Sequence, residues 1–367
     1  MEALIQEIHN IIGDYRIEEG FGIPQERIRD WIWQFDEPDR EFVLEELINI
    51  FNKRYISKEK AKDIVKEMIA FLAGQEKYDS HEMFLKDCQF IDHQPEGKSQ
   101  KVLLAFLDEV LKEDFGMKLS DCNSKEAKFH IYFDDILCTG DTIVKGLGHK
   151  DYGWYFQKRD GEKTNLDVVI EKKETMIWAY FAIHTRGRIK ASRRLYMAAG
   201  KRDPKLHYAW EEKFQIDNDC NNSKSSLGFL YPLESVKDDD VQKCQDHIIE
   251  KVTKYCEEND YETPKESFFY RPVGRPPNEV LFSSPENRER FEKIMLKICI
   301  KVYNSAHSEY TRMRPLGYGL VTDLSFGFGA LIFSWRNVPF NVPMIFWYEH
   351  RGWIYLFKRK YVTYDAE

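Results

Sequence analysis

Two adjacent carboxylates stand just before a small turn rich in hydroxyl groups, within the segment HIYFDDILCTGDTIV of residues 130–144. The two acids, Asp134 and Asp135, can accept hydrogen bonds from sugar hydroxyls or bind a divalent cation. Backbone N–H groups and hydroxyls of the turn can converge on one phosphate, with a helix N-terminus behind them. These groups together indicate a site for a ribose phosphate. The turn consists of Cys138, Thr139, Gly140, Asp141 and Thr142.

The elements that must position these groups are a strand and a helix. Phe129, Ile131 and Phe133 are apolar with the period of a strand, which predicts a buried strand that delivers both acids to its carboxyl end. Open α/β sheets bind ligands at that end. A solvated helix N-cap is the simpler interpretation, since Asp and Thr are good caps. A cap, however, requires neither a second acid nor a preceding buried strand.

The pattern of a hydrophobic strand, DD, three apolar or small residues and TGDT resembles the phosphoribosyl pyrophosphate (PRPP) loop of type I phosphoribosyltransferases. This resemblance implies an α/β fold with a parallel sheet and helices on both faces. It also implies that Asp134 and Asp135 hold the ribose hydroxyls, directly or through Mg²⁺. Residues 139–142 would cradle the 5-phosphate, and Asp141 would be the acid nearest the reacting sugar.

A second candidate site lies upstream, where a short strand, a Gly-Lys-Ser loop and an amphipathic helix are expected across residues 88–111. Gly97 would let the backbone approach an anion, and the helix start adds positive potential. It is not a P-loop, because no glycine stands at position 92. It fits the pyrophosphate loop of the same family, in which Lys98 would neutralise the diphosphate while Gly97 and Ser99 donate to its oxygens. An ordinary polar turn remains the alternative.

Composition limits the class of protein. The chain has 367 residues, 43% of them hydrophobic, which supports a substantial core. We expect a cytoplasmic protein, because there is no run of eighteen apolar residues and the start MEALIQEIHN lacks signal-peptide features. The seven cysteines are scattered without a CxxC pair, so neither a disulfide framework nor a zinc site is predicted.

The net charge of −8 argues against general attraction to nucleic acid or to an anionic membrane. A local exception is the segment HTRGRIKASRRL of residues 184–195, which carries five arginine or lysine side chains. It fits a solvated loop and first helical turn after a strand. It also fits an edge that faces a partner or nucleic acid.

Two regions are expected along the chain. Residues 1–80 have helical periodicity and predict a small bundle or winged-helix-like cap, and residues 81–367 predict the phosphoribosyltransferase-like domain with inserted elements and an aromatic C-terminal section. In that section the unit NVPFNVP places Asn337 and Asn341 on a rigid turn. Such a turn is more often structural. As part of the site it would close over the reacting carbon of the ribose, as the hood element of phosphoribosyltransferases does.

The helical IRDWIWQF segment, the GKSQ and FDDILCTGDT loops, and the LGYG, FGFG and NVPFNVP units together resemble the phosphoribosyltransferase-like effectors of bacterial conflict systems. Such effectors occur in antiphage loci, including retrons. The resemblance implies an enzyme that binds PRPP or a nucleotide with Mg²⁺, restrained by a reverse transcriptase and its RNA–DNA product. The alternative is a non-catalytic subunit that only senses PRPP or a nucleotide.

Overall fold

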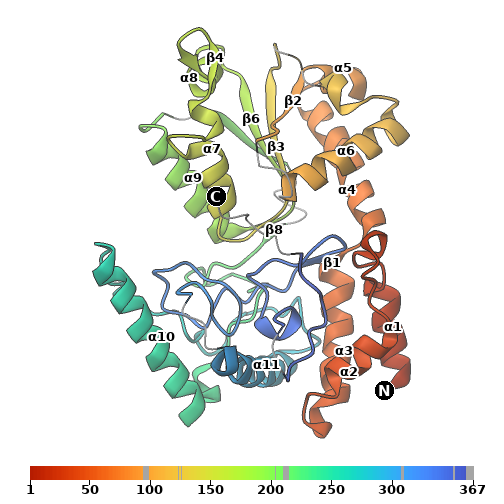
Figure 1. The fold of residues 1–367 in the computed structure, drawn as a ribbon. Coiled ribbons are helices and arrows are strands. Elements are labelled where there is room, and N and C mark those ends of the chain that lie inside the picture. Colours follow the sequence, from red (N-terminus) through yellow and green to blue (C-terminus); the bar gives the residue numbers. More distant parts are fainter. Residues whose placement is uncertain are drawn as a thin grey trace. The chain divides into compact units, whose positions relative to one another are not determined.

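The computed structural model describes residues 1–93, 99–122, 124, 126–202, 204–209, 215–306, 310–349 and 352–360. It divides into two compact units that interrupt each other along the chain (Figure 1). Unit 1 contains residues 1–58 and 217–361, and unit 2 contains residues 59–216 and 362–367.

Unit 2 is an α/β unit. Its larger sheet is wholly parallel, with the strand order β2-β3-β6-β7, and β8 pairs with the end of β6. The small β4–β5 hairpin stands apart from it. The strands are β2 (Cys88–Phe90), β3 (Phe129–Leu137), β4 (Lys158–Asp160), β5 (Lys163–Thr164), β6 (Thr175–His184), β7 (Lys205–Ala209) and β8 (Gln215–Ile216). The helices are α4 (Lys58–Gln75), α5 (His81–Lys86), α6 (Ser99–Phe115), α7 (Asp141–Gly148), α8 (Asn165–Glu171) and α9 (Thr185–Ala198).

Helices cover both faces of this sheet (Figure 1). On one face, Phe181 of β6 contacts Phe106 of α6 and Phe133 of β3, with ring centroids 6.3 and 5.5 Å apart. On the other face, Tyr132 and Trp178 share a core with residues of α7, α8 and α9. Every residue of β6 is buried, as expected for a central parallel strand. The mixed α/β fold with a parallel sheet that the sequence predicts is therefore present.

A buried charge network lies at the amino edge of the sheet, away from the two acids of β3. The His130 ring bonds Glu174 at 2.7 Å through Nε2 and Gln89 at 2.9 Å through Nδ1. Arg159 donates to the same Glu174 carboxylate at 2.6 Å. Burial lowers the pKa of His130, although Glu174 acts in the opposite direction. The imidazole is thus held neutral near pH 7.

Lowering the pH is expected to destabilise unit 2 through this histidine. The pKa of His130 is depressed in the folded state, so below its unfolded value of about 6.5 the unfolded chain binds the proton more readily. Stability should therefore fall as the pH drops below about 6.5, by at most about 1.4 kcal/mol per pH unit for one proton. Urea midpoints between pH 7.5 and 5.5 would show a shallower slope for His130→Gln. The matched control is His149→Gln, at a half-exposed ring, and equal slopes for both variants would contradict this role.

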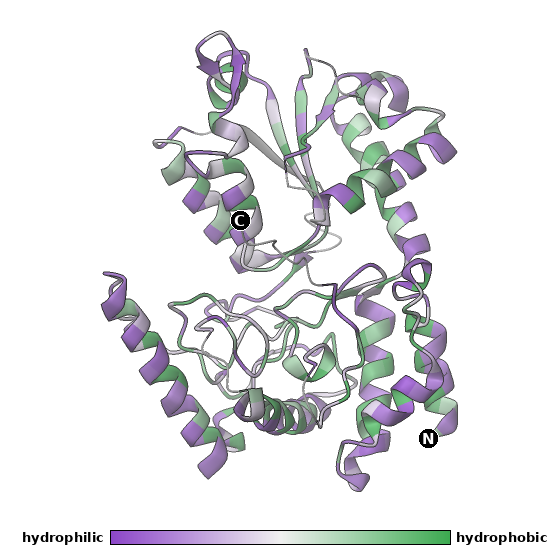
Figure 2. Cartoon of the chain, in the orientation of Figure 1, coloured by the Kyte–Doolittle hydropathy of each residue, from purple (hydrophilic) through white to green (hydrophobic). Residues whose placement is uncertain are grey.

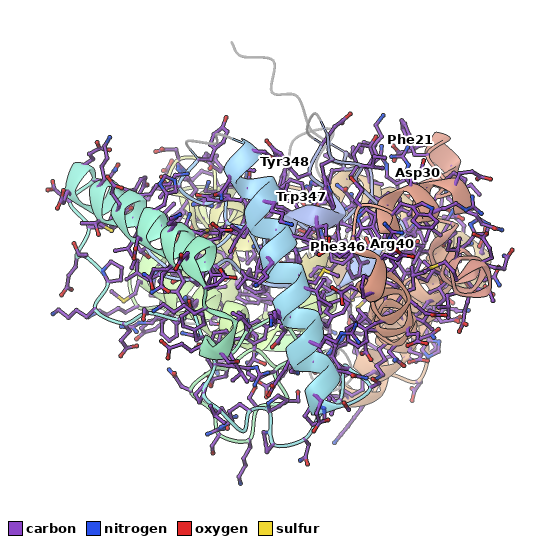
Figure 3. The ribbon with its side chains drawn as sticks, turned by 90° about the horizontal axis from the view of Figure 1, so that it is seen from below. Phe21, Asp30, Arg40, Phe346, Trp347 and Tyr348 are labelled. Atoms are coloured by element: carbon purple, nitrogen blue, oxygen red, sulfur yellow. The ribbon has the colours of Figure 1, made fainter. Side chains whose placement is uncertain are left out.

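Unit 1 combines five α-helices among its described residues with long loops. It contains the two-stranded parallel pairing of β1 with β9 and a C-terminal section of turns. Its elements are α1 (Glu2–Ile12), α2 (Gln25–Ile32), α3 (Glu37–Arg54), β1 (Tyr55–Ile56), α10 (Asp239–Glu258), α11 (Pro285–Ala306) and β9 (Phe333–Ser334), with the 3₁₀ turn η5 (Met344–Phe346) against α11 (Figure 3).

The division of the chain differs from the boundary expected near residue 80. The N-terminal helices belong with the C-terminal section because their apolar faces pack against it. The Trp31 indole donates to the Ile345 carbonyl at 2.9 Å and stacks on Phe346 at 5.5 Å. Phe51 meets Phe333 edge-on at 5.1 Å. Residues 1–58 therefore do not form a separate cap, whereas α4 lies in the α/β unit.

The C-terminal section contains far less strand than its apolar runs suggest. Between residues 314 and 349 the described chain is almost entirely turns, with β9 as a two-residue strand. By contrast, the sequence predicts a helix over residues 285–306 and a charged helix over residues 237–259; α11 matches the first, and α10 lies close to the second. Most of α10 is hydrophilic (Figure 2), and its buried residues recur every three or four positions: Val241, Cys244, Ile248, Val252 and Cys256. None of the described helices is both long and apolar enough to cross a bilayer.

Candidate functional site

The two adjacent acids lie at the carboxyl end of β3, as the sequence predicts. Asp134 is buried, at 4% exposure, whereas Asp135 is partly exposed. The Asp135 N–H donates to Asp134 Oδ1 at 3.0 Å, and the Ile136 N–H donates to Asp135 Oδ1 at 2.7 Å. These local bonds orient both carboxylates at the edge where parallel sheets bind ligands.

The turn after β3 leads directly into α7. Gly140 is the N-cap residue, with a left-handed φ of 78°. A Cβ at this position would also lie 2.5 Å from the Cβ of Ala191. The Val144 N–H makes the first helical bond, to the Gly140 carbonyl at 3.1 Å. Glycine is therefore required here both by conformation and by space, and the N-terminus of α7 follows the two acids closely.

The start of α9 closes the other side of the turn. A Cβ on Gly187 would lie 1.7 Å from the Cys138 carbonyl oxygen, so the helix backbone rests directly on the turn. His184, fully buried at the end of β6, bonds the Leu137 carbonyl through Nδ1 at 3.0 Å. The turn that carries the candidate phosphate-binding groups is thus held by the neighbouring strand and helix.

Asp141, the acid expected nearest the reacting sugar, is the first residue of α7. Its carboxylate forms an ion pair with Arg194 of α9. Its N–H lies 3.5 Å from Thr139 Oγ1, while Thr142 is exposed on the first turn of the helix. All five basic side chains of the segment 184–195 therefore lie in α9, beside the turn.

Neutral, buried groups surround the acids. The Cys138 thiol is buried, and burial with the nearby Asp135 charge raises its pKa well above the usual value. Cys138 therefore contributes to the turn through its backbone and not as a thiolate. Burial also raises the pKa of Tyr180, with further contributions from Tyr132, Asp134 and Asp135. Tyr180 pairs with Asp134 in the strand register.

The second predicted loop falls largely outside the described residues. Gly97 and Lys98 lie there, and their assigned roles stay predictions. Ser99 is the first residue of α6. Because β2 pairs with β3 in parallel, the chain leaves β2 at the same edge of the sheet as the acids.

Asn337 and Asn341 belong to unit 1, whereas the two acids and the turn that follows them, residues 134–142, belong to unit 2 and are called the DD turn below. Their amides bond backbone: Asn337 Oδ1 accepts from Lys360 N–H at 3.2 Å, and Asn341 Nδ2 donates to the Tyr318 carbonyl at 2.7 Å. These bonds to backbone groups agree with a structural role for the NVPFNVP turn. The predicted closure over the reactive carbon stays a prediction.

Several residues that shape the site were not singled out from the sequence: His184, Gly187 and Ala191. A glycine near the start of a helix that directly follows a buried strand was the available signal, because glycine is unfavourable inside helices unless something packs closely. His184 offered no separate signal, since its bond to the Leu137 carbonyl depends on strand pairing.

The chemistry of the acids is compatible with Mg²⁺, which the resemblance implies. Within the described ranges, no group of three or more His, Cys, Asp or Glu side chains could hold a metal ion. Mg²⁺ is commonly bound by one or two carboxylates together with water and substrate phosphates. Asp134 and Asp135 supply such a pair, so they fit an ion that is held jointly with a substrate.

The parallel α/β sheet and the DD turn define a phosphoribosyltransferase-like protein. A model of the PRTase-CE family matches residues 28–359, nearly the whole chain, and the protein belongs to that family. No curated protein and no solved structure matches the chain.

Proposed function

We propose that the protein binds PRPP or a nucleotide with Mg²⁺ at the carboxyl end of β3 and cleaves or transfers at the anomeric carbon of the ribose. The observation that carries this proposal is the succession of a buried acid, a partly exposed acid and a glycine-capped helix start on one turn. Membership of the PRTase-CE family supports it independently.

Each group of the site has a role in this reaction. The carboxylates of Asp134 and Asp135 accept hydrogen bonds from the ribose hydroxyls, which fixes the ring. The backbone N–H groups and hydroxyls of residues 139–142, at the N-terminus of α7, bind the 5-phosphate. Departure of the leaving group builds positive charge on the ribose ring, as in glycoside hydrolysis, and nearby acids such as Asp141 stabilise it.

Two charged components complete the proposal. Mg²⁺, held by Asp134 and Asp135 with the substrate, would neutralise the charge that develops on the leaving group. Lys98 and its neighbours Gly97 and Ser99 would bind the diphosphate. Arg194 shows that α9 brings positive charge to the turn, since it pairs with Asp141. A polyphosphate substrate is attracted by such a basic edge.

The biological role that we propose is that of a toxic effector in antiphage defence of the retron type. Its activity would deplete or modify nucleotides and arrest growth. A reverse transcriptase and its RNA–DNA product would be the restraining partner. The support for this role is the resemblance of the IRDWIWQF, FDDILCTGDT and LGYG segments to effectors of bacterial conflict systems.

A non-catalytic sensor of PRPP or nucleotide is the second candidate. The ion pair of Asp141 with Arg194 favours it, because a carboxylate neutralised by a guanidinium stabilises a developing positive charge less well. A sensor would bind the ligand without consuming it, whereas an enzyme would release pyrophosphate or a free base.

Calorimetric titration of PRPP with Mg²⁺ tests the proposal. The wild-type protein should bind, and the double variant Asp134→Asn, Asp135→Asn should lose at least about a hundredfold in affinity, since two charge-assisted contacts of about 1.5–3 kcal/mol each disappear. The matched control is Asp151→Asn, at a highly exposed acid of the same unit.

The outcome separates the hypotheses. Unchanged binding in the double variant would refute the assignment of the acids. If the ligand binds but chromatography of the nucleotides detects no product, the sensor hypothesis is favoured. No binding of either PRPP or nucleotides by the wild type would refute both.

A further inference from the structure

Among the described residues of unit 1, two arginines have no exposed surface, and their surroundings differ sharply. Arg288 of α11 is fully engaged: Nη1 and Nη2 donate to the Phe229 and Leu227 carbonyls at 3.1 and 2.8 Å, and the guanidinium pairs with Glu279 and Glu292. A buried guanidinium is normally satisfied in this way, because its charge and five N–H donors are costly to leave without acceptors.

Arg314 lacks such a set of acceptors. Its Nη1 donates to the Met313 carbonyl at 3.1 Å, while Nε and Nη2 are buried and have no hydrogen-bond partner. Burial lowers the pKa of Arg314 to about 10, although Tyr303, Asp323 and Cys244 act in the opposite direction, so the side chain is still charged at neutral pH. This arginine lies in the RPLGYG segment, which the proposed function does not use.

A second unsatisfied donor lies near Arg314. The hydroxyl of Tyr303, near the end of α11, is also buried and without a partner, and its ring is 4% exposed. Burial raises the pKa of Tyr303 to about 12, whereas the charge of Arg314 acts in the opposite direction. The hydroxyl therefore keeps its proton and can donate it. Cys244 of α10 is also buried beside Arg314 and stays a neutral thiol.

These groups share one chemical need. The Nε and Nη2 groups of the charged guanidinium and the Tyr303 O–H all require acceptors. The charge of Asp323 acts on Arg314, but this carboxylate accepts none of these hydrogen bonds. A single ordered water would accept some of these bonds but would not compensate the charge. A planar guanidinium matches the oxygens of a phosphate or carboxylate through two parallel bonds.

We propose that Arg314 and Tyr303 form an anion-binding site within unit 1, and that its ligand is a small oxyanion of the phosphate class. The site is separate from the DD turn, which lies in unit 2. Its occupant would be held between α10, the end of α11 and the RPLGYG segment (Figure 3 shows the two helices).

Hydrogen exchange of the full-length protein, followed by mass spectrometry, tests this site with inorganic phosphate as the probe. Sodium chloride at the same ionic strength replaces phosphate in the comparison sample. At about ten times the dissociation constant, exchange in peptides 241–256 and 296–306 should slow by about tenfold in the wild type. Phosphate bound at the DD turn would instead protect peptides near residues 137–145, so the two sites are distinguished. Sodium chloride should protect the α10 and α11 peptides much less.

Two variants complete the test. Arg314→Met should abolish the protection of α10 and α11 while leaving any effect at the DD turn, and Tyr303→Phe should weaken phosphate binding by about fivefold through the loss of one hydrogen bond. In phosphate-free buffer Arg314→Met should melt at the same or a higher temperature than the wild type, because a buried charge with two unsatisfied donor groups is removed. No phosphate protection of these peptides in the wild type, equal protection by chloride, or protection that persists in Arg314→Met would overturn the proposal.

Discussion

Replacing Gly187 with alanine is expected to abolish ligand binding at the DD turn and to destabilise unit 2. The added Cβ would lie 1.7 Å from the Cys138 carbonyl oxygen, and the nearby carbonyl carbon would be 2.8 Å away. Both are backbone atoms, so α9 or the turn must move. A shift of about 1 Å in the phosphate-binding groups costs about a hundredfold in function, and overpacking costs about 1–3 kcal/mol. Calorimetric titration and urea unfolding measure the two effects.

The matched control is Gly74→Ala, at another helical glycine of unit 2. A Cβ on Gly74 in α4 meets no atom within 4 Å. Alanine should therefore stabilise this helix by about 0.5–1 kcal/mol, and binding should not change. If Gly187→Ala bound ligand as tightly as Gly74→Ala does, the turn would not depend on the packing of α9, and the geometry of the candidate site would have to be revised.

The core of the candidate site could be predicted because it is local in sequence. Asp134 and Asp135, Gly140 and the start of α7 follow one another along a single strand and turn, so strand periodicity and turn chemistry were sufficient. The supports of that turn could not be predicted in the same way. His184 and Gly187 reach the Leu137 and Cys138 carbonyls only because β6 pairs with β3. Their part in the site follows from the sheet and not from their own segment.

The same distinction applies to the fold. The apolar run of residues 175–185 predicts a central strand and the run of residues 285–306 predicts a helix, and β6 and α11 have nearly these bounds. The division into units depends on contacts between distant segments. Trp31 and Ile345, for example, are bonded across most of the chain. The helical periodicity around Trp31 shows that one face is apolar but not which segment covers it.

Which charged residues are buried is the hardest feature to predict from the sequence. Arg288 lies on a charged helix in a run of polar residues, and its sequence surroundings resemble those of the exposed Arg290. Their environments differ because Leu227, Phe229 and Glu279 come from other segments. Periodicity places Arg288 near the buried face of α11, but a charged residue on such a face is usually expected to reach solvent.

Replacing Arg288 with methionine is therefore expected to destabilise unit 1 by about 3–5 kcal/mol, because it removes one side of a buried ion network. Glu279 and Glu292, at most 6% exposed as side chains, would lose their shared guanidinium, and two backbone carbonyls would lose their donor. The control is Arg290→Met, on the exposed side of the same helix. The half-exposed guanidinium of Arg290 pairs with Asp39 at 2.9 Å, and a surface ion pair contributes at most about 1 kcal/mol to stability. Urea unfolding, monitored by hydrogen exchange of the α11 amides, reports the stability of unit 1 separately from that of unit 2. If Arg288→Met lowered the free energy of unfolding no more than Arg290→Met does, the buried network would contribute no more to stability than a surface pair. It would also weaken the contrast between Arg288 and Arg314, because a buried guanidinium that can be removed at little cost does not demand a full set of acceptors.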